Sequence, residues 1–490
     1  MVINPVLLIA VPLGLAFSTI LFGFISRKIA KYIPLVGTLF NLIVSLYLLP
    51  DVLKKPIVVS IGGFRPPFCI NLVAGPVGIL FSIAISLIGF LVSIYALGYI
   101  REGAVEKYHM LYLLLLTGAT GVVLTGDIFN LFVFYEILCI SSYALVAYSG
   151  DSTGIESAVK YLIQGSIGTS LVLMAVGMLY GLFGTLNMAD IARSIDAVGL
   201  KSVFVPLAFL ISGLGVEAAI FPLNAWLPDA HSSAPSSISA VLSGIAIMIG
   251  VYAETRVVFT IFGEQSILPF LVLLGLVTLF IGEMSAFSQS NVKRMLAYSS
   301  IGQIGLIIFA FGIGNFYGVA GGLFQIVTHA LGKSLLFLAA GYMIYRTGSM
   351  EISSLKGMGK KMPFTSFAFT VGAFSLMGLP PFAGFPSKLS IVRAALAKRE
   401  NLFTTFIILA LFATVIEGAY FFRVVQTIYF KGENTELKKK EAPVSALIPM
   451  AILVILILIV GLYPKSVTNI LNSAASEFLN RINYIKEVLG

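Results

Sequence analysis

Runs of about 20 consecutive apolar residues dominate the sequence and recur from Pro5 to Leu462. Wound as a helix, such a run crosses the roughly 30 Å hydrocarbon core of a bilayer. Hydrophobic residues make up 58% of the chain and charged residues only 11%, too few to cover a water-facing globular surface. The runs are continuous and lack the alternation of membrane-barrel strands. The sequence therefore predicts an all-α, polytopic membrane protein with about fourteen spans.

The basic residues point to a membrane surface and not to nucleic acid. The formal net charge is +9, and its basic residues gather in short connections such as "SRKIAKY" and "ELKKKE". This is the pattern of lipid headgroup contact and of the positive-inside rule. Threading the spans alternately puts Arg101, Lys293 and the lysines at 438–440 on one face, which we expect to be cytoplasmic. The first apolar run is expected to be a retained span and not a cleaved signal peptide.

Few side chains are available for metal or cofactor chemistry. The two cysteines, Cys69 and Cys139, lie in different segments without a CxxC spacing, and the chain has three histidines. Neither a disulfide framework nor iron–sulfur or haem ligation is predicted. We therefore expect no cofactor and no enzyme active site in this chain. Any redox chemistry would belong to partner subunits.

Two predicted spans are interrupted by proline in a comparable way, at "AAIFPLNAWLPDA" and "SLMGLPPFAGFPSK". Proline removes a backbone hydrogen bond and clashes with the preceding turn, so each segment is predicted to be a broken helix. Paired interruptions in two halves of a chain indicate inverted repeats and ion sites near the membrane midplane. The alternative is a pair of simple kinks in a structural bundle.

Ionisable residues inside spans are costly, by about 2.5 to 3.5 kcal/mol at the centre, and mark wet interiors or buried partners. Five such residues interrupt the apolar runs: Glu136, Glu217, His329, Lys333 and Lys388. Three more, Glu283, Glu417 and Arg423, lie near span ends, where we expect the side chains to snorkel to the surface.

The spacing of these residues favours proton chemistry. His329 and Lys333 are four positions apart and share one helix face, where an imidazole and an ammonium group can exchange protons through water. Lys388 follows "FAGFPS", whose small and helix-breaking residues let water or carbonyl groups approach. Burial disfavours the charged form of either kind of group, which eases proton uptake and release. A line of such groups across the bundle would form a proton relay.

Six stretches occur in the order typical of one family of membrane subunits. They are "TGDIFNLFVFYEILCISSYALVAY", "GTLNMADI", "FPLNAWLPDAH", "NVKRMLAYSSIGQIG", "THALGKSLLFLAAG" and "GLPPFAGFPSK". Through them the chain resembles the large antiporter-like subunits shared by Mrp-type sodium/proton antiporters, respiratory complex I and the related membrane-bound hydrogenases and sulfur-reducing complexes of archaea. It is most similar to the Mrp D-type subunit, over essentially the whole chain.

This resemblance implies two inverted five-helix repeats, each holding one broken helix. The implied segments are helices 1 to 3 in residues 1–109, the first repeat in 110–262, the second in 263–430, and helix 14 with an interfacial C-terminal helix in 431–490. The implied function is translocation of protons, and in some members sodium, by one subunit of a hetero-oligomeric complex in the cell membrane. Which of the related complexes this would be stays open.

The resemblance also assigns roles to particular positions. Glu136 matches the glutamate of the family's fifth helix, and Lys293 matches the lysine before "LAYSS". His329 and Lys333 match the charged pair of the eleventh helix, and Lys388 matches the charged residue at the break of the twelfth. These residues are the expected translocation pathway, together with Glu217.

Two departures fall in the first half. Glu217 stands where the family carries the lysine that pairs with the fifth-helix glutamate, and Met248 stands where D-type subunits typically carry another. If Glu217 lies near Glu136, the two carboxyl groups cannot both ionise cheaply and should titrate together. They would then relay protons, hold sodium with nearby oxygen atoms, or form an inert, structural first half. A non-conducting subunit that couples its neighbours mechanically is the alternative function.

Overall fold

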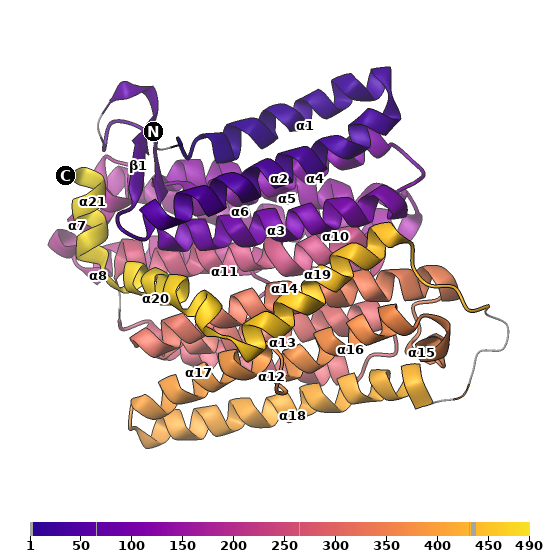
Figure 1. The fold of residues 1–490 in the computed structure, drawn as a ribbon. Coiled ribbons are helices and arrows are strands. Elements are labelled where there is room, and N and C mark those ends of the chain that lie inside the picture. The colour runs from indigo at the N-terminus through magenta and orange to yellow at the C-terminus, as the bar shows by residue number, and fades with distance from the viewer. Residues whose placement is uncertain (1–2, 65, 264, 431, 433–437) are drawn as a thin grey trace.

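The computed structural model describes residues 3–64, 66–263, 265–430, 432 and 438–490, and most of them lie in helices that run side by side (Figure 1). Within this described part, twelve helices are long and apolar enough to cross a membrane. The predicted all-α, polytopic architecture is confirmed. The number of fourteen spans stays a prediction.

The N-terminal segment contains three helices and one small hairpin. Its elements are α1 (Leu7–Ile25), α2 (Arg27–Val52), β1 (Ile57–Ser60), β2 (Asn71–Ala74) and α3 (Pro76–Tyr99). The two strands pair antiparallel, with Ile57 opposite Ala74 and Ser60 opposite Asn71. The hairpin was not predicted, because its apolar residues resemble those of the neighbouring spans.

Two groups of helices follow. The first contains α4 (Val105–Leu124), α5 (Ile128–Val146), α6 (Ser152–Phe183), α7 (Met188–Val198), α8 (Leu200–Glu217), α9 (Trp226–Ser233), α10 (Ser236–Val241), the π-helix η3 (Leu242–Ala246), α11 (Ile247–Arg256) and the π-helix η4 (Val257–Phe262). The second contains α12 (Leu268–Phe287), α13 (Val292–Gly312), α14 (Phe316–Thr347), η5 (Ile352–Leu355), α15 (Met358–Lys361), α16 (Pro363–Met377), α17 (Gly384–Ala397) and α18 (Asn401–Phe430).

Both proline-rich stretches interrupt helices, as predicted. Helix α8 ends at Glu217 and α9 begins at Trp226, while α16 ends at Met377 and α17 begins at Gly384. A break in a helix leaves backbone N–H and C=O groups without their helical hydrogen bonds. Where no water reaches them, these groups need other hydrogen-bond partners within the protein. At the first break the indole Nε1 of Trp226 donates to the carbonyl oxygen of Val216, 2.8 Å away.

The two groups repeat some local features. The side chain of Asp127 caps α5, and the side chain of Asn291 caps α13. Each capping residue also forms an isolated antiparallel bridge, Asp127 with Asn187 and Asn291 with Glu351. These matches fit two related halves. The inverted relation and the limits 110–262 and 263–430 stay predictions, and residues 431 and 433–437, at the last predicted boundary, lie outside the described part.

The chain ends in α19 (Val444–Leu462), α20 (Lys465–Leu479) and α21 (Arg481–Leu489). The tail is helical as predicted, but α20 packs on α3 and α14 and buries Leu471 and Phe478. A carboxylate oxygen of Glu477 accepts a hydrogen bond from the backbone nitrogen of Val77, at the start of α3 (2.8 Å). The apolar face of α20 is therefore covered by protein. The position of the tail at a membrane interface stays a prediction.

Basic residues predicted to share a face do lie together. Arg101 and Lys293 line one cavity, and a guanidinium nitrogen of Arg346 donates to the carbonyl oxygen of Lys438 (3.1 Å). Arg101 also lines a second cavity with Arg346 and Lys440, so these basic residues lie at one end of the bundle. That this end faces the cytoplasm stays a prediction.

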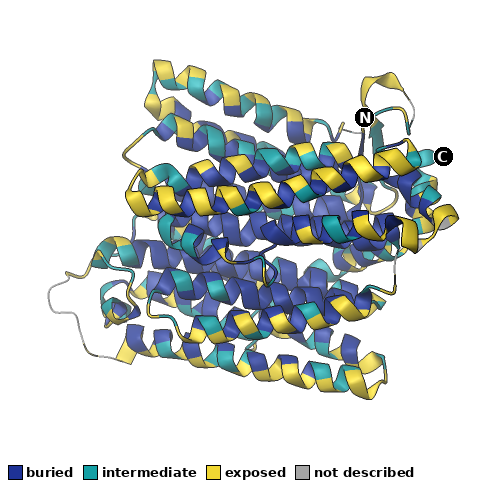
Figure 2. Cartoon of the chain, turned by 180° about the vertical axis from the view of Figure 1, so that it is seen from behind, coloured by how far each residue is buried: buried dark blue, intermediate teal, exposed yellow. Residues whose placement is uncertain are grey.

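The surface is apolar, unlike that of a water-soluble protein, and the largely apolar interior holds several ionisable groups. Exposed residues cover the outer sides of the peripheral helices, while the central helices are buried (Figure 2). Many exposed side chains are large and apolar, such as Phe17 (59% exposed) and Val415 (68% exposed). Such a surface suits hydrocarbon. Several ionisable side chains, by contrast, lie in the interior, among them Glu217, Lys333 and Glu417.

Helices α12 and α13 meet backbone to backbone. A Cβ atom added to Gly282 would lie 2.2 Å from the backbone nitrogen of Gly302, and one added to Gly305 would lie 2.2 Å from that of Leu279. Small residues allow this approach between membrane helices. Gly302 also leaves room for a buried carboxyl group, because its Cβ would lie 2.1 Å from an oxygen of Glu283.

We expect Gly305→Ala to lower the melting temperature of the purified protein in detergent. The new methyl group meets backbone that cannot rotate away, and overpacking of this kind costs about 1–3 kcal/mol. The matched control is Gly177→Ala on α6, where the added Cβ has no atom within 4 Å. The control should be neutral or stabilising by up to about 1 kcal/mol. Equal melting shifts for the two variants would contradict the close α12–α13 contact.

Candidate functional site

A buried ion pair joins two helices of the second half. The Lys388 Nζ atom on α17 lies 2.6 Å from a carboxylate oxygen of Glu417 on α18. Glu417 is fully buried. The expectation that Glu417 snorkels to the surface is wrong, because the residue lies in the middle of a 30-residue helix. Its partner comes from a different helix, which spacing along the sequence does not reveal.

Buried amide groups hold this ion pair in place. The other carboxylate oxygen of Glu417 accepts from the Gln303 side-chain amide (2.6 Å), whose oxygen accepts from the Gln325 amide (2.5 Å). The Ser387 hydroxyl then donates to the Gln325 oxygen (2.6 Å). The sequence reasoning missed both glutamines. The available signal was that Gln325 lies four positions before His329, on the face shared with Lys333.

Lys333 connects to a second buried carboxyl group. Its Nζ atom donates to the Leu296 carbonyl oxygen (2.9 Å) and to the Ser299 hydroxyl (2.7 Å). The Tyr420 hydroxyl lies within hydrogen-bonding reach of Ser299 and donates to a carboxylate oxygen of Glu283 (2.8 Å). Glu283 is fully buried, so the expectation that it snorkels is also wrong.

These four charged residues form a balanced cluster. Lys333, Lys388, Glu283 and Glu417 lie within electrostatic reach of one another. Two lysines face two glutamates, so each buried charge has an opposite charge nearby, which burial requires. A proton added or removed at one member changes the field at the other three.

His329 is held by a carbonyl oxygen that a π-turn releases. In η3 the backbone nitrogen of Ile247 donates to the carbonyl of Leu242, five residues back, instead of to Ser243. The freed Ser243 carbonyl oxygen lies 3.2 Å from the Nε2 atom of His329. Because a carbonyl only accepts, Nε2 carries the hydrogen. The Nδ1 atom is buried and has no hydrogen-bond partner among the described residues, so it is open to a proton.

The Lys293 side chain, on α13, contacts the C-terminal end of α9, the second segment of the first broken helix. Its Nζ atom donates to the Ala234 carbonyl oxygen (2.5 Å), just after α9, and a helix C-terminus favours a cation. His231 on α9 lies within electrostatic reach of Lys293, His329 and Lys333, and its ring stacks on Phe337 with centroids 4.8 Å apart. The sequence reasoning did not single out His231, although it closes the "FPLNAWLPDAH" stretch.

Asp229 joins the two halves beside this point. One carboxylate oxygen of Asp229 on α9 lies 3.1 Å from the Lys160 Nζ atom on α6, and the other lies 2.7 Å from a guanidinium nitrogen of Arg294 on α13. The first broken helix is thus tied to one helix from each half. Its position relative to Lys293 is fixed as a result.

In the first half, Glu217 is buried among uncharged donors. The Tyr161 hydroxyl donates to one carboxylate oxygen, and the Cys139 thiol lies 3.5 Å from the other. The Tyr161 ring stacks flat on Trp226, with centroids 3.7 Å apart. No lysine, arginine or histidine makes a hydrogen bond or ion pair with Glu217 within the described part of the chain.

Glu136 is close to Glu217 but less enclosed. It lies within electrostatic reach of Glu217, and its side chain on α5 is only partly buried. No hydrogen bond joins the two carboxyl groups in the part of the chain that the structure describes. Met248 is buried on α11, where the family's lysine is expected. Sodium binding at this site stays a prediction, since the described residues contain no group of three His, Cys, Asp or Glu side chains suited to a metal ion.

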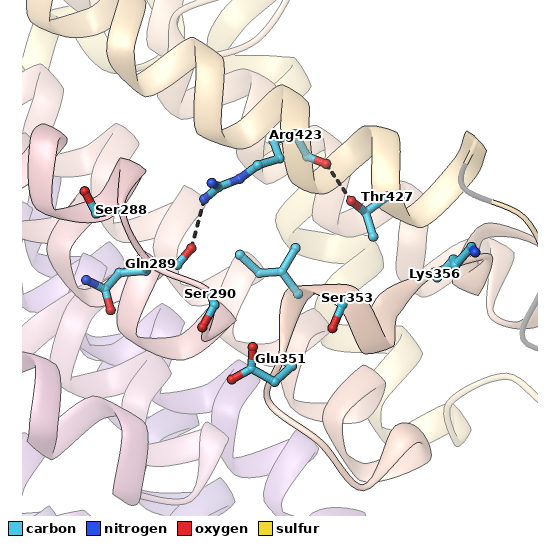
Figure 3. A pocket seen from close by; sticks show the side chains of 9 residues that line it. Ser288, Gln289, Ser290, Glu351, Ser353, Lys356, Arg423 and Thr427 are labelled. Carbon is cyan, nitrogen blue, oxygen red and sulfur yellow. Dashed lines mark hydrogen bonds between the residues drawn. The ribbon is translucent and has the colours of Figure 1, made fainter.

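Arg423 does reach the surface, unlike the two glutamates. It lines an open cleft of about 640 Å³ with Glu351 and Lys356, and a guanidinium nitrogen donates to the Gln289 carbonyl oxygen (2.9 Å; Figure 3). The cleft contains none of the predicted translocation residues. The cleft is therefore separate from the buried ionisable residues described above.

The fold and the buried charges define a polytopic membrane subunit with a row of ionisable groups through its interior. The family described as "NADH:quinone oxidoreductase/Mrp antiporter, TM" matches residues 125–416. The chain belongs to this family.

Three relatives extend the match to almost the whole chain. NADH-quinone oxidoreductase subunit N of Desulforudis audaxviator (strain MP104C) is 32% identical over 94% of this chain and 96% of its own length. A chain in the structure of the membrane-bound sulfane sulfur reductase (MBS), an archaeal respiratory membrane complex, is 39% identical, with a TM-score of 0.93 and 99% of both chains covered. A chain of the Mrp complex from Dietzia sp. DQ12-45-1b is 25% identical, with a TM-score of 0.92 and full coverage of both.

We expect Glu417→Gln to destabilise the purified protein strongly, because it leaves the Lys388 ammonium buried without its counter-ion. Breaking a buried pair costs about 3–5 kcal/mol. The double variant Lys388→Met/Glu417→Gln should cost less than the sum of the single variants, since it removes both charges. The measurement is the melting temperature in detergent.

Lys160→Met serves as the control for this cycle. Its side chain is 52% exposed and pairs with Glu156 and Asp229 at the surface, where an ion pair contributes about 0–1 kcal/mol. Additive losses in the double variant would contradict a direct interaction between Lys388 and Glu417.

Proposed function

We propose that this chain translocates protons as an antiporter-like subunit of a multisubunit complex in the plasma membrane. One observation carries the proposal: buried ionisable groups follow one another from Lys293 to Lys388, all of them in the second half except His231 of α9. The intermediate members are His231, His329, Lys333, Glu283 and Glu417. Ionisable residues inside a bundle are expensive and are retained where ions or protons move.

The geometry suits short proton transfers. At His329 the Nε2–H group is engaged and Nδ1 is open, so the ring can take a proton on one nitrogen and release another from the opposite side. The Lys333 ammonium donates to Ser299, whose hydroxyl leads to Tyr420 and Glu283. Each transfer changes the charge beside the Lys388–Glu417 pair. The protonation of that pair, at one end of the row, is thereby coupled to proton movement that begins at Lys293.

A cavity gives the row access to one end of the bundle. It has a volume of about 680 Å³ and is lined by Lys293, Arg101 and hydroxyl groups that include Tyr99 and Ser236. The polar groups in its wall and this volume suit water. Protons would reach Lys293 from the end that carries the basic residues.

The relatives support a role inside a larger assembly. Their names place them in NADH-quinone oxidoreductase, in the membrane-bound sulfane sulfur reductase and in the Mrp complex. We propose that this chain also works beside other membrane subunits, in an Mrp-type antiporter or a related respiratory complex. Any redox chemistry would then belong to the partners.

The test is proton flux after reconstitution of the purified complex into liposomes, measured with a pH-sensitive dye in sodium-containing and sodium-free buffer. Lys333→Ala and Lys388→Ala should each lower the flux by about tenfold or more, the order expected when a positioned proton carrier is removed. Lys201→Ala, at an exposed position at the start of α8, is the control and should keep the parent rate.

Each outcome discriminates between the two functions considered. Parent-level flux in both buried-lysine variants would overturn the proposal and favour the non-conducting coupling subunit. A loss that appears only with sodium present would assign sodium, not protons alone, to the second half.

A further inference from the structure

Helix α11 carries a second buried acid in the first half, which the row described above does not use. Glu254 is 1% exposed, and neither of its carboxyl oxygens has a hydrogen-bond partner among the described residues. Glu217, by contrast, accepts from both Tyr161 and Cys139. The two acids of this half therefore have very different surroundings.

The neighbouring Arg256 does not neutralise Glu254. Residues two positions apart point to nearly opposite sides of a helix. The Arg256 guanidinium is engaged on its own side by the Tyr252 hydroxyl and lies over the Tyr484 ring, 5.6 Å from the centroid. Glu254 also makes no ion pair within the described part of the chain.

Close backbone contact brings the face of Glu254 to the Glu217 site. A Cβ atom on Gly250 would lie 2.5 Å from the backbone nitrogen of Ala218 and 3.0 Å from the carbonyl carbon of Glu217. Glu254 is four residues, one helical turn, beyond Gly250 on the same face. Tyr135 lies within electrostatic reach of both Glu217 and Glu254, and its hydroxyl donates to the Leu214 carbonyl oxygen (3.2 Å).

These contacts decide where a shared proton rests. A carboxylate is stabilised by hydrogen-bond donors, and burying one without any is far more costly than burying the neutral acid. Glu217 has the donors and Glu254 has none. One proton shared by the two groups therefore rests on Glu254 while Glu217 carries the negative charge.

We propose that Glu254 is a second proton-binding carboxyl group of the first half and exchanges its proton with Glu217 past Tyr135. In each exchange the O–H bond of Glu254 breaks as an O–H bond forms on Glu217, so the pair keeps one proton and one negative charge. The exchange needs no cation, and the half that has Glu217 and Met248 in place of lysines still carries protons. This inference rests on the proposed translocation function.

The first test is chemical and does not depend on transport. The complex in liposomes is treated with dicyclohexylcarbodiimide, an apolar reagent that attacks protonated carboxyl groups in membranes, and the modified residues are mapped by mass spectrometry. Glu254 should be modified faster than Glu217, and Glu254→Gln should remove the label. Modification of Glu217 with no modification of Glu254 would overturn the proposal.

The second test measures flux through the same complex. Glu254→Gln should lower proton flux by about tenfold, while Glu254→Asp should retain most of it because it keeps an ionisable carboxyl group. Thr255→Val is the matched control, a buried neighbour on the same helix that carries no exchangeable carboxyl proton. It should keep the parent rate.

The two proposals fail in different ways. Normal flux in Glu254→Gln together with lost flux in Lys388→Ala would overturn the role of Glu254 and leave the second half as the pathway. If Glu254→Gln does not assemble, the labelling of the unsubstituted complex and the flux of Glu254→Asp still decide the question. Loss of flux in Glu254→Asp to the level of an empty liposome would overturn the exchange, because a carboxyl group alone would not suffice.

Discussion

Inside a membrane, a polar group that is buried without a partner is costly, and this constraint accounts for much of the structure. Helices satisfy their own backbone groups, so irregular backbone occurs only where other groups replace the lost bonds. At the first break Trp226 caps a carbonyl oxygen of α8, and at η3 His329 takes the carbonyl oxygen that the π-turn frees. The same rule places Lys388 against Glu417.

The two halves meet this constraint in different ways. In the second half, two lysines and two glutamates compensate one another, and Gln303 and Gln325 complete the hydrogen bonds of the pair. In the first half, Glu217 relies on uncharged donors, Tyr161 and Cys139. A balanced cluster can lose or gain a proton with a modest change in energy, whereas an all-acid site must hold at least one proton to remain buried.

Close helix packing makes room for these groups. The glycines of α12 and α13 bring two backbones together and leave space for the Glu283 carboxyl beside Gly302. Gly250 brings the backbone of α11 against the backbone of Glu217 and Ala218 at the end of α8. In both halves the smallest residue type lies next to a buried acid, so packing and proton chemistry depend on the same positions.

Sequence reasoning found the membrane spans, both broken helices and the cationic members of the second half, because length, proline and charge are visible in one dimension. It placed Glu283 and Glu417 at the surface, although both are buried, and it did not single out His231 or Glu254. Glu417 belongs to the row only because α18 packs on α17, and Glu254 stands out only because no donor surrounds it. The first is a contact between helices and the second is a missing contact.

The sequence by itself therefore determined the class of fold and singled out some of the buried charges, since crossing hydrocarbon requires long apolar helices and makes a charge near the middle of a span conspicuous. The tertiary structure decided which charges face one another, because partners such as Lys388 and Glu417 are supplied by different helices. It also decided how the acids of the first half are held, with Glu217 given hydrogen-bond donors and Glu254 left without them.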